Sequence, residues 1–540
     1  MTRRAGSRDV PEGVLDTHAP GVEEALEQAG APADAPLWLF GDQLGPAVHA
    51  LPQHAAREVV LIESSAVLRR KRFHRQKLHL VLSGMRHLDE ELGDRSTYSR
   101  TRTYREALEE VGRPVVVHQP TSHAAVAFVE RLREEGLVAA VLPTTTFARP
   151  RAEFAAWAGD DSSFTMENFY RNQRRRFDVL MEGERPVGGK WNLDHDNREP
   201  PPKDAKRRGA GPSGQEARTL GVPEPWWPTE DEVDAQVRRD LDAATETGDL
   251  ATVGRDGPRL FAVTAAEARA ALRRFVEHRL DPFGPHEDAI LSADPWMSHS
   301  LLSVPQNLGV LHPLEAVHAA EQAHRDGAAR LNSVEGFVRQ ILGWREYIWQ
   351  LYWHFGPDYV RRNEMGHRTP LPDWWSDLDG DAVTAACLSE TLNGVRDRGW
   401  VHHIPRLMVL GNHALQREYG PQALSDWFAT TFVDGFAWVM PPNVVGMSQH
   451  ADGGKLATKP YSSGGAYINK MSDHCGDCAF DPKVRVGEKA CPFSAGYWRF
   501  VHRHQDLLRA NQRTARSVAT MERLKDLEAV LEQEHHRETF

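Results

Sequence analysis

Short apolar runs alternate with amphipathic segments over the first third of the chain. Four of these runs have the length and composition of buried strands, at residues 37–40, 59–62, 115–117 and 138–142. Between them, residues 67–92 and 123–135 place apolar side chains at helical spacing. Because strands that alternate with helices usually build parallel sheets, we expect a doubly wound α/β domain here.

The pattern changes near the middle of the chain. Residues 197–227 are dense in Pro, Gly and charged side chains, which is typical of a linker. After Val263, helical spacing replaces strand-like alternation. We therefore predict a loosely ordered tail over residues 1–35, a Rossmann-like α/β domain over 36–165, an interdomain segment with helices and a Pro/Gly-rich loop over 166–262, an all-α domain over 263–517 and an amphipathic C-terminal helix over 518–540.

The composition is that of a globular protein. Of the 540 residues, 40% are hydrophobic and 26% are charged, so neither a disordered nor a fibrous chain is favoured. No apolar run is long enough to span a membrane, and no apolar block follows the basic residues at the N-terminus. We expect a cytoplasmic monomer without membrane contact. The net charge of -11 argues against a generally basic surface, but it is compatible with one basic face.

Four cysteines in the helical half are candidates for a metal centre. Two residues separate the second from the third and twelve separate the third from the fourth, in the set Cys387, Cys475, Cys478 and Cys491. A C-x2-C clip with two further thiolates can enclose one metal centre, and disulfides are not expected in a cytoplasmic chain. Structural zinc, an iron-sulfur cluster and four unrelated buried thiols all fit this spacing, and Pro492 after Cys491 favours iron-sulfur.

Several motifs, in order along the chain, resemble the bacterial iron-sulfur branch of photolyases and cryptochromes. The N-terminal half contains FGDQL (40–44), GMRHL (84–88), FYRNQRRR (169–176) and GGKWNLDHDNR (188–198). The helical half contains VRQILGWREY (338–347), WVHHIPRLMVLGN (400–412), WFATTFVDGFAWVMPPNVVGMSQ (427–449) and KPYSSGGAYINKMSDHCGDC (459–478). The resemblance covers residues 36–510. It implies an α/β antenna domain and an all-α domain that binds FAD, with the four cysteines as ligands of a [4Fe-4S] cluster.

The same resemblance implies where FAD binds. The diphosphate is expected at SHSLLSVPQNLG (298–309), at residues Ser300, Leu301, Leu302 and Ser303 with Arg345 nearby. Hydroxyl and backbone N–H groups suit a diphosphate, although a serine-rich helix cap has the same composition. Arg406 and Asp434 match the arginine and aspartate that flank the isoalloxazine, and an internal ion pair is the alternative interpretation of Arg345 and Asp434.

Histidine and tryptophan residues are expected to carry protons and electrons. His402 and His403 correspond to residues that face the lesion pocket in (6-4) photolyases, where histidine suits proton transfer near neutral pH. Trp427 matches the flavin-proximal tryptophan of the family's electron relay, and Trp375 or Trp374 is the next member. The alternative for each of these residues is ordinary packing.

UV-damaged DNA is the partner that the resemblance implies. The negatively charged DNA backbone needs a basic face on the protein, and the two damaged bases must leave the base stack. Eight side chains are candidates for that face, with a solvated helix surface as the alternative: Arg171, Arg174, Arg175, Arg176, Lys203, Lys206, Arg207 and Arg208.

Three departures from the family pattern affect these expectations. The positions where relatives grip a ribityllumazine antenna hold Val67 and Arg70, while Asp42 and Glu63 remain, so an antenna chromophore is doubtful. Met440 faces flavin N5, where relatives have a carboxylate or amide, unless the register slips to Asn443. A thioether is a poor hydrogen-bond partner, so the reduced flavin should be stabilised differently. Phe428 replaces a tyrosine that is common near the relay.

The sequence therefore predicts light-driven repair of pyrimidine photoproducts, with the (6-4) lesion favoured over the cyclobutane lesion. The alternative is a cryptochrome-like blue-light photoreceptor of the same fold, which would act through a signalling partner. A nucleic-acid-binding protein with a structural metal is a third possibility. Repair of lesions in illuminated, reduced protein distinguishes the first from the others.

Overall fold

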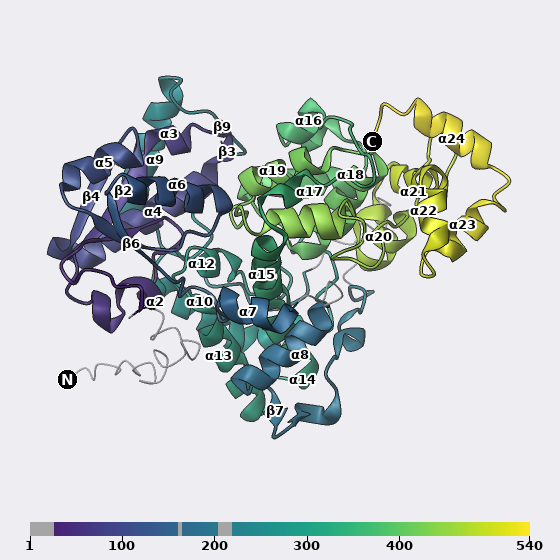
Figure 1. The fold of residues 1–540 in the computed structure, drawn as a ribbon. Coiled ribbons are helices and arrows are strands. Elements are labelled where there is room, and N and C mark those ends of the chain that lie inside the picture. Colours follow the sequence, from purple (N-terminus) through teal and green to yellow (C-terminus); the bar gives the residue numbers. More distant parts are fainter. Residues whose placement is uncertain (1–25, 27, 160–164, 204–218) are drawn as a thin grey trace, which may run out of the picture.

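A computed structural model describes residues 26, 28–159, 165–203 and 219–540 (Figure 1). Five parallel strands form the N-terminal sheet in the order β4-β2-β1-β5-β6. They are β1 (Leu37–Leu39), β2 (Val59–Ser64), β4 (Ser96–Thr101), β5 (Val115–His118) and β6 (Val138–Leu142). All four predicted strands are present. The expected tail over residues 1–35 lies mostly outside the described residues.

Helices cover both faces of this sheet, which confirms the doubly wound α/β fold. Leu39 and Leu61 lie on the face that belongs to the large core shared with α4 (Arg75–Leu92). Val60 and Val117 lie on the other face, against α5 (Tyr104–Val111) and α6 (His123–Glu134). Successive strand residues point to opposite faces, so each strand contributes to both cores. Short helices α2 (Pro46–His49) and α3 (Ser65–Leu68) follow β1 and β2.

Strand β4 has no counterpart among the predicted strands. It lies at the sheet edge, pairs with β2 alone and has the sequence STYSRT. Its residues are exposed or half-buried rather than buried. An edge strand of this kind needs no apolar run, so hydrophobicity alone does not reveal it.

The loop after β1 joins the sheet to the helical domain. The strand order reverses between β1 and β5, and here Asp42 accepts a hydrogen bond from Thr121. Leu44 N donates to Leu308 O at 3.0 Å. A Cβ atom on Gly45 would lie 1.8 Å from Gly309 O, so only glycine allows this approach. The FGDQL and SVPQNLG motifs are therefore in contact.

The middle of the chain packs against both domains. Helix α8 (Met166–Phe177) follows α7 (Arg151–Ala158) and contacts residues 339–345 of the helical domain, whereas α9 (Glu232–Glu246) packs on α4. Two-residue strands complete the segment: β3 (Phe73–His74) pairs with β9 (Thr252–Val253), and β7 (Met181–Glu182) pairs with β8 (Arg185–Pro186).

The second domain is helical, as the spacing predicts (Figure 1). Its helices before the cysteine region are α10 (Ala265–His278), α11 (Leu280–Phe283), α12 (Ser303–Asn307), α13 (Pro313–Arg325), α14 (Leu331–Val338), α15 (Glu346–Phe355), α16 (Asp373–Ser376), α17 (Ala386–Arg398), α18 (Asn412–Gln416) and α19 (Pro421–Thr431). Further helices are α20 (Gly465–Met471), α21 (Pro492–Arg503) and α22 (Gln505–Ala510). The C-terminal segment forms α23 (Ala515–Met521) and α24 (Leu527–His535) rather than one helix.

Three stretches of π-helix interrupt these helices at Arg339–Arg345, Pro405–Gly411 and Pro442–Ser448. Each contains one predicted flavin-binding residue, in the order Arg345, Arg406 and Asn443. Because π-helical turns often occur at functional sites, this coincidence draws attention to the space between them. None of the described helices combines the length and the apolar composition that crossing a bilayer requires.

Candidate functional site

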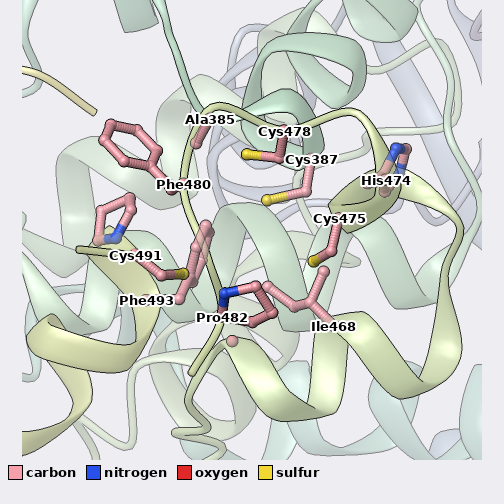
Figure 2. Close-up of a pocket in the computed structure, with 12 residues that line it drawn as sticks. Ala385, Cys387, Ile468, His474, Cys475, Cys478, Phe480, Pro482, Cys491 and Phe493 are labelled. Carbon is pink, nitrogen blue, oxygen red and sulfur yellow. The ribbon is translucent and has the colours of Figure 1, made fainter. Parts of the chain in front are cut away.

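The four cysteines lie around one cavity. Cys387 lies in the first turn of α17, and Cys491 precedes α21. Cys475 lies in the short 3-10 helix His474–Gly476, and Cys478 follows that helix. Figure 2 shows their sulfur atoms turned toward the same space, which Phe480 and the other lining residues make largely apolar. All four are free of disulfides. The structure thus brings together side chains that are more than a hundred residues apart.

This arrangement of four sulfur atoms is more typical of a metal-binding site than of four cysteines that bind nothing. Burial, and then the neighbouring sulfurs, raise the pKa of the Cys387 thiol well above its ordinary value. Four thiolates in such a cavity would repel one another unless a positive centre stood between them. Gly465 keeps the space open, because a Cβ atom there would lie 2.7 Å from the sulfur of Cys491.

A second buried site is centred on the carboxylate of Asp434. Arg406 donates to both of its oxygens, at 2.9 and 3.0 Å, and Ser303 Oγ donates at 2.8 Å. Asn307 Nδ2 donates to the Asp434 carbonyl at 3.0 Å. The internal ion pair that was the alternative for Asp434 is therefore formed, with Arg406, and a predicted diphosphate residue takes part in it.

Helix α12 links this network to Arg345. The Arg345 guanidinium donates to Gln306 O at 3.2 Å and to Glu346 at 3.0 Å. Arg345 Nε and Gln306 Nε2 are buried without a partner in the part of the chain that the structure describes. Such unpaired donors are costly, so they fit a site that receives a polar ligand. Ser300 and Leu302 lie in the preceding loop, where Leu301 adopts φ +58°, a conformation that costs about 1–3 kcal/mol and is common at functional sites.

Met440 and Asn443 lie close to this network in sequence but do not join it. Met440 is buried in the core that includes Trp427 and Phe428. Asn443 Nδ2 donates to Val439 O at 2.9 Å, so its amide N–H is already used within its own turn. The prediction that Met440 faces flavin N5 stays a prediction.

Lys77 is a site residue that the sequence did not reveal. It comes from α4 of the sheet domain, and its ammonium is buried against the end of α19, where it donates to Ala429 O at 2.6 Å, Phe432 O at 3.3 Å and Gly435 O. Burial lowers the pKa of Lys77 to about 7, against the opposing charge of Asp434. Lys77 therefore ties the sheet domain to the backbone on either side of Asp434.

Because of Lys77, we expect the stability of the folded protein to depend on pH. The unfolded chain keeps the Lys77 proton up to a pKa of 10.5, whereas the folded protein loses it above about 7. Since the unfolded state then binds more protons, the folded state should gain roughly 1 kcal/mol per pH unit as the pH rises from 7 to 10. Melting temperatures of wild type and Lys77→Met, measured at pH 7, 8 and 9, should diverge in favour of wild type with rising pH.

The control for Lys77 is Lys190→Met, because Lys190 is exposed and is not among the charges that act on Lys77. This variant should keep a constant difference from wild type over the same range. A constant difference for Lys77→Met as well would contradict the assignment.

Three histidines form a cluster next to Arg406. The rings of His299 and His402 are stacked with centroids 4.4 Å apart, and His403 lies 5.8 Å from His402. His402 is 4% exposed, and neither of its ring nitrogens has a partner among the described residues. Burial and neighbouring positive charges lower the pKa of His299 and His402 well below the ordinary value, so both are neutral near pH 7.

His403 differs from its two neighbours. Its side chain is 45% exposed, and Nε2 lies 3.3 Å from a carboxylate oxygen of Asp288. Desolvation would lower the pKa of His403, but the hydrogen bond and the charge of Asp288 outweigh it and raise the pKa. Glu287, buried beside them, has its pKa raised to about 7 by burial. His403 is thus the member of the cluster that carries a proton most readily.

The two predicted relay tryptophans are in contact. The ring centroids of Trp427 and Trp375 are 5.1 Å apart, and Trp374 lies 5.8 Å beyond Trp375. Trp375 is fully buried, whereas Trp374 is half-buried. Phe432 lies 5.9 Å from Trp427 and under the Arg406 guanidinium, 4.4 Å from its carbon. An aromatic row therefore leads from Arg406 toward solvent, and it contains both candidates for the second position.

The predicted DNA-binding arginines of α8 do not all face solvent. Arg174 is 1% exposed and donates to Leu180 O at 2.6 Å, so its assignment to a basic face is wrong. Arg171 and Arg176 pair with Glu167 and Glu153, while Arg175 is exposed above the ring of Trp191. Lys203 is exposed. Lys206, Arg207 and Arg208 lie outside the described residues.

Both carboxylates that remain at the antenna position have partners. Glu63 accepts from Arg86 at 2.7 Å and from the hydroxyl of Tyr98, and Arg100 lies 3.4 Å away. Asp42 accepts from Thr121. A chromophore would have to compete with these contacts, and binding of a ribityllumazine stays an open prediction.

Several known proteins are similar to this chain in sequence or in fold. A model of the family described as deoxyribodipyrimidine photo-lyase-related protein matches residues 37–251. The (6-4) photolyase of Agrobacterium fabrum is 38% identical over 506 residues, which cover 90% of this chain and 95% of that protein. A bacterial class III photolyase structure from Agrobacterium tumefaciens aligns with TM-score 0.54 and 16% identity over 88% of this chain and 98% of that one. The cryptochrome of Synechocystis sp. PCC6803 aligns with TM-score 0.53 and 11% identity over 82% and 89%.

The parallel sheet domain followed by a helical domain is the fold of the photolyase/cryptochrome superfamily. Within that superfamily, the chain belongs to the family of the (6-4) photolyase of Agrobacterium fabrum, and its residues 37–251 match the model of deoxyribodipyrimidine photo-lyase-related protein. The family resemblance of the motifs is confirmed.

Proposed function

We propose that this protein uses light to repair UV-induced pyrimidine photoproducts in DNA, and that the (6-4) photoproduct is its substrate. The observation that carries the proposal is the position of a protonatable histidine, His403, beside the buried network of Arg406 and Asp434. Arg406 acts electrostatically on His402 and His403, so these groups belong to one site. The 38% identity to a (6-4) photolyase supports the same substrate class.

FAD is the cofactor that this site would hold, and when bound it supplies the light-driven one-electron chemistry. Arg406 fixes the orientation of Asp434, whose carboxylate can accept hydrogen bonds from the polar edge of the ring system. The phosphates suit the loop of Ser300 and Ser303, with the buried guanidinium of Arg345 to balance their charge. Lys77 holds the backbone around Asp434 from the sheet domain.

The cysteine cavity would hold a [4Fe-4S] cluster. Its thiolate donor set and its enclosure suit iron-sulfur or zinc, and the family favours the cluster. Binding there ties α17 to the segments before α21, so its role is to hold distant parts of the helical domain together.

His403 would supply the proton that repair of a (6-4) lesion needs. Asp288 holds the imidazole of His403 and favours its protonated form. Because the His403 side chain is partly exposed, a damaged pyrimidine pair that has left the base stack can reach it. His402 is neutral and has no hydrogen-bond partner among the described residues, so it can donate one hydrogen bond to the lesion and accept another. Exposed basic groups such as Arg175 and Lys203 would contact the DNA backbone.

A repair assay tests the proposal. Purified protein, reduced without oxygen and illuminated with blue light, should restore (6-4) photoproducts in duplex and single-stranded DNA. Dark samples should restore none. If flavin is bound and photoreduced but neither (6-4) nor cyclobutane lesions are repaired, the repair function is wrong and the photoreceptor alternative takes its place.

The proton role of His403 is tested by two variants. His403→Ala should bind lesion DNA but lose at least about 100-fold in repair rate, the usual range for a lost general acid. Asp288→Asn should lower the pKa of His403 and move the high-pH limit of repair to lower pH. His536→Ala, which removes an exposed histidine near the C-terminus, is the control. An unchanged pH profile in Asp288→Asn would contradict the proton role.

A further inference from the structure

A second row of tryptophans also begins next to Arg406. Trp400 and Trp296 are stacked, with ring centroids 5.3 Å apart and planes at 26°. Trp227 continues the row, 5.1 Å from Trp296. These three residues come from different segments, since Trp400 follows α17, Trp296 precedes α12 and Trp227 precedes α9. None of them was singled out as a relay residue from the sequence.

The inner end of this row is at the candidate flavin site. Trp400 is 4% exposed, and the Arg406 guanidinium carbon lies 5.9 Å from the centre of its ring. The ring of His299 is 6.5 Å away. Arg406 also covers Phe432 at 4.4 Å, the contact that leads to Trp427. The two rows therefore both begin at the Arg406 guanidinium group.

The outer end of the row reaches the surface. Trp296 and Trp227 are both half-buried, so solvent touches two of the three rings. Burial falls outward from Trp400, as it falls from Trp375 to Trp374 in the first row. By contrast, the aromatic group of Trp349, Trp353 and Trp438 is buried throughout. A gradient from a buried site to solvent distinguishes the two rows from ordinary aromatic packing.

We propose that Trp400, Trp296 and Trp227 form a second electron-transfer branch for flavin photoreduction, parallel to the row of Trp427, Trp375 and Trp374. The proposal rests on the proposed function, because it requires flavin to bind next to Arg406. Ring contacts of about 5–6 Å are also those of the first row, so both rows meet the same geometric condition.

The electrons balance in this scheme. Trp400 gives one electron to the light-excited flavin and becomes a radical cation. Trp296 then reduces Trp400, and Trp227 reduces Trp296. A thiol in the solvent reduces the oxidised Trp227 and is itself oxidised, and two such thiols form a disulfide and release two protons. Each electron that enters the site is thus matched by one taken from a thiol.

Parallel branches predict a specific pattern of mutant rates. Photoreduction would be measured on the flavin-loaded protein under blue light, without oxygen and with dithiothreitol. The rates of parallel routes add, so the rates that remain in Trp375→Phe and in Trp400→Phe should sum to about the wild-type rate. The double variant lacks both routes and should lower the rate at least about 20-fold. Trp296→Phe, at a half-buried position, should act like Trp400→Phe without disturbing the site itself.

The matched control is Trp38→Phe, which changes a fully buried tryptophan of β1 in the sheet domain that packs on Phe40 and Tyr104. It should photoreduce at the wild-type rate. A second measurement does not depend on the rate. Transient absorption in Trp427→Phe, which removes the inner tryptophan of the first row, should still show a tryptophan radical, and mass spectrometry after prolonged illumination should find oxidised Trp227.

Two results would overturn the second branch. One is a Trp375→Phe rate as low as that of the double variant. The other is a wild-type photoreduction rate for the single variants Trp296→Phe and Trp400→Phe. Failure of the proposed function gives a different result. In that case the wild-type protein binds no flavin, or it repairs no lesion after its flavin has been reduced with dithionite. Neither result depends on the tryptophan variants.

Discussion

Cys475→Ser and Cys491→Ser are each expected to abolish binding of the proposed [4Fe-4S] cluster and to leave the C-terminal part of the helical domain largely unfolded. The four sulfurs enclose one largely apolar cavity, and Cys387 and Cys491 stand at the starts of two different helices. Where a metal centre links segments, its binding free energy is folding free energy. A hydroxyl is a poor ligand for iron in a thiolate site, so one substitution should release the whole cluster.

Iron content and the broad visible absorption of the purified variants measure this outcome. Both should fall at least about tenfold relative to wild type, with a large drop in melting temperature, because metal release and unfolding are coupled. Ser494→Ala is the matched control. It removes a hydroxyl that accepts from Gly465 N at 3.1 Å next to Cys491, but it leaves the four sulfurs in place, so iron should remain.

Wild-type protein that contains zinc and no iron, with the same cavity intact, would contradict the cluster and support structural zinc. Variants that keep their iron would show that the cysteines are not its ligands. Either measurement is independent of flavin and of repair, so it separates the metal site from the light-driven function.

Hydrophobic periodicity predicts the helices and strands whose buried and exposed positions are clearly separated, and the strands that are buried on both faces. The strand at residues 59–62 is buried on both faces in the sheet, and its continuous apolar run reveals it. Strand β4 is missed because its edge position leaves the side chains half-exposed. Arg174 is misplaced for a related reason, since four arginines at helical spacing do not show which one points inward to bind backbone carbonyls.

Some of the candidate site residues can likewise be recognised from the sequence, and others cannot. Cys475 and Cys478 are recognisable from their spacing, and His402 and His403 from a motif, because their signals are local. Lys77, Asp288 and Trp296 are not recognisable, since each acts through partners that the fold brings from distant segments. Lys77 lies more than three hundred residues from the carbonyls that it binds, and nothing in its own segment reports that contact.

The other large effect is expected from the ion pair between Arg406 and Asp434. Asp434→Asn should reduce bound flavin at least about tenfold, because it removes the carboxylate that we propose as the hydrogen-bond acceptor for the ring system. The variant should also be destabilised, since it leaves the Arg406 guanidinium, only 19% exposed, without its partner. Removing one member of a buried pair typically costs about 3–5 kcal/mol.

The double variant Asp434→Asn/Arg406→Gln separates flavin binding from stability. Neutral side chains at both positions relieve the unpaired charge, so the melting temperature should recover relative to Asp434→Asn. Flavin, measured by its absorbance per protein chain, should stay as low as in the single variant if the pair contacts the cofactor. A double variant that recovers both stability and flavin would show that the pair is only structural.

A second buried ion pair, Arg417 with Glu534 at 2.7 Å, provides the control for this experiment. It resembles the first pair in burial, but its partners are Pro492 and Arg537 rather than any predicted flavin residue. Glu534→Gln should therefore lower the melting temperature as Asp434→Asn does, and yet keep wild-type flavin. Equal loss of flavin in both variants would mean that destabilisation alone releases the cofactor, and the assignment of Asp434 to the flavin would fail.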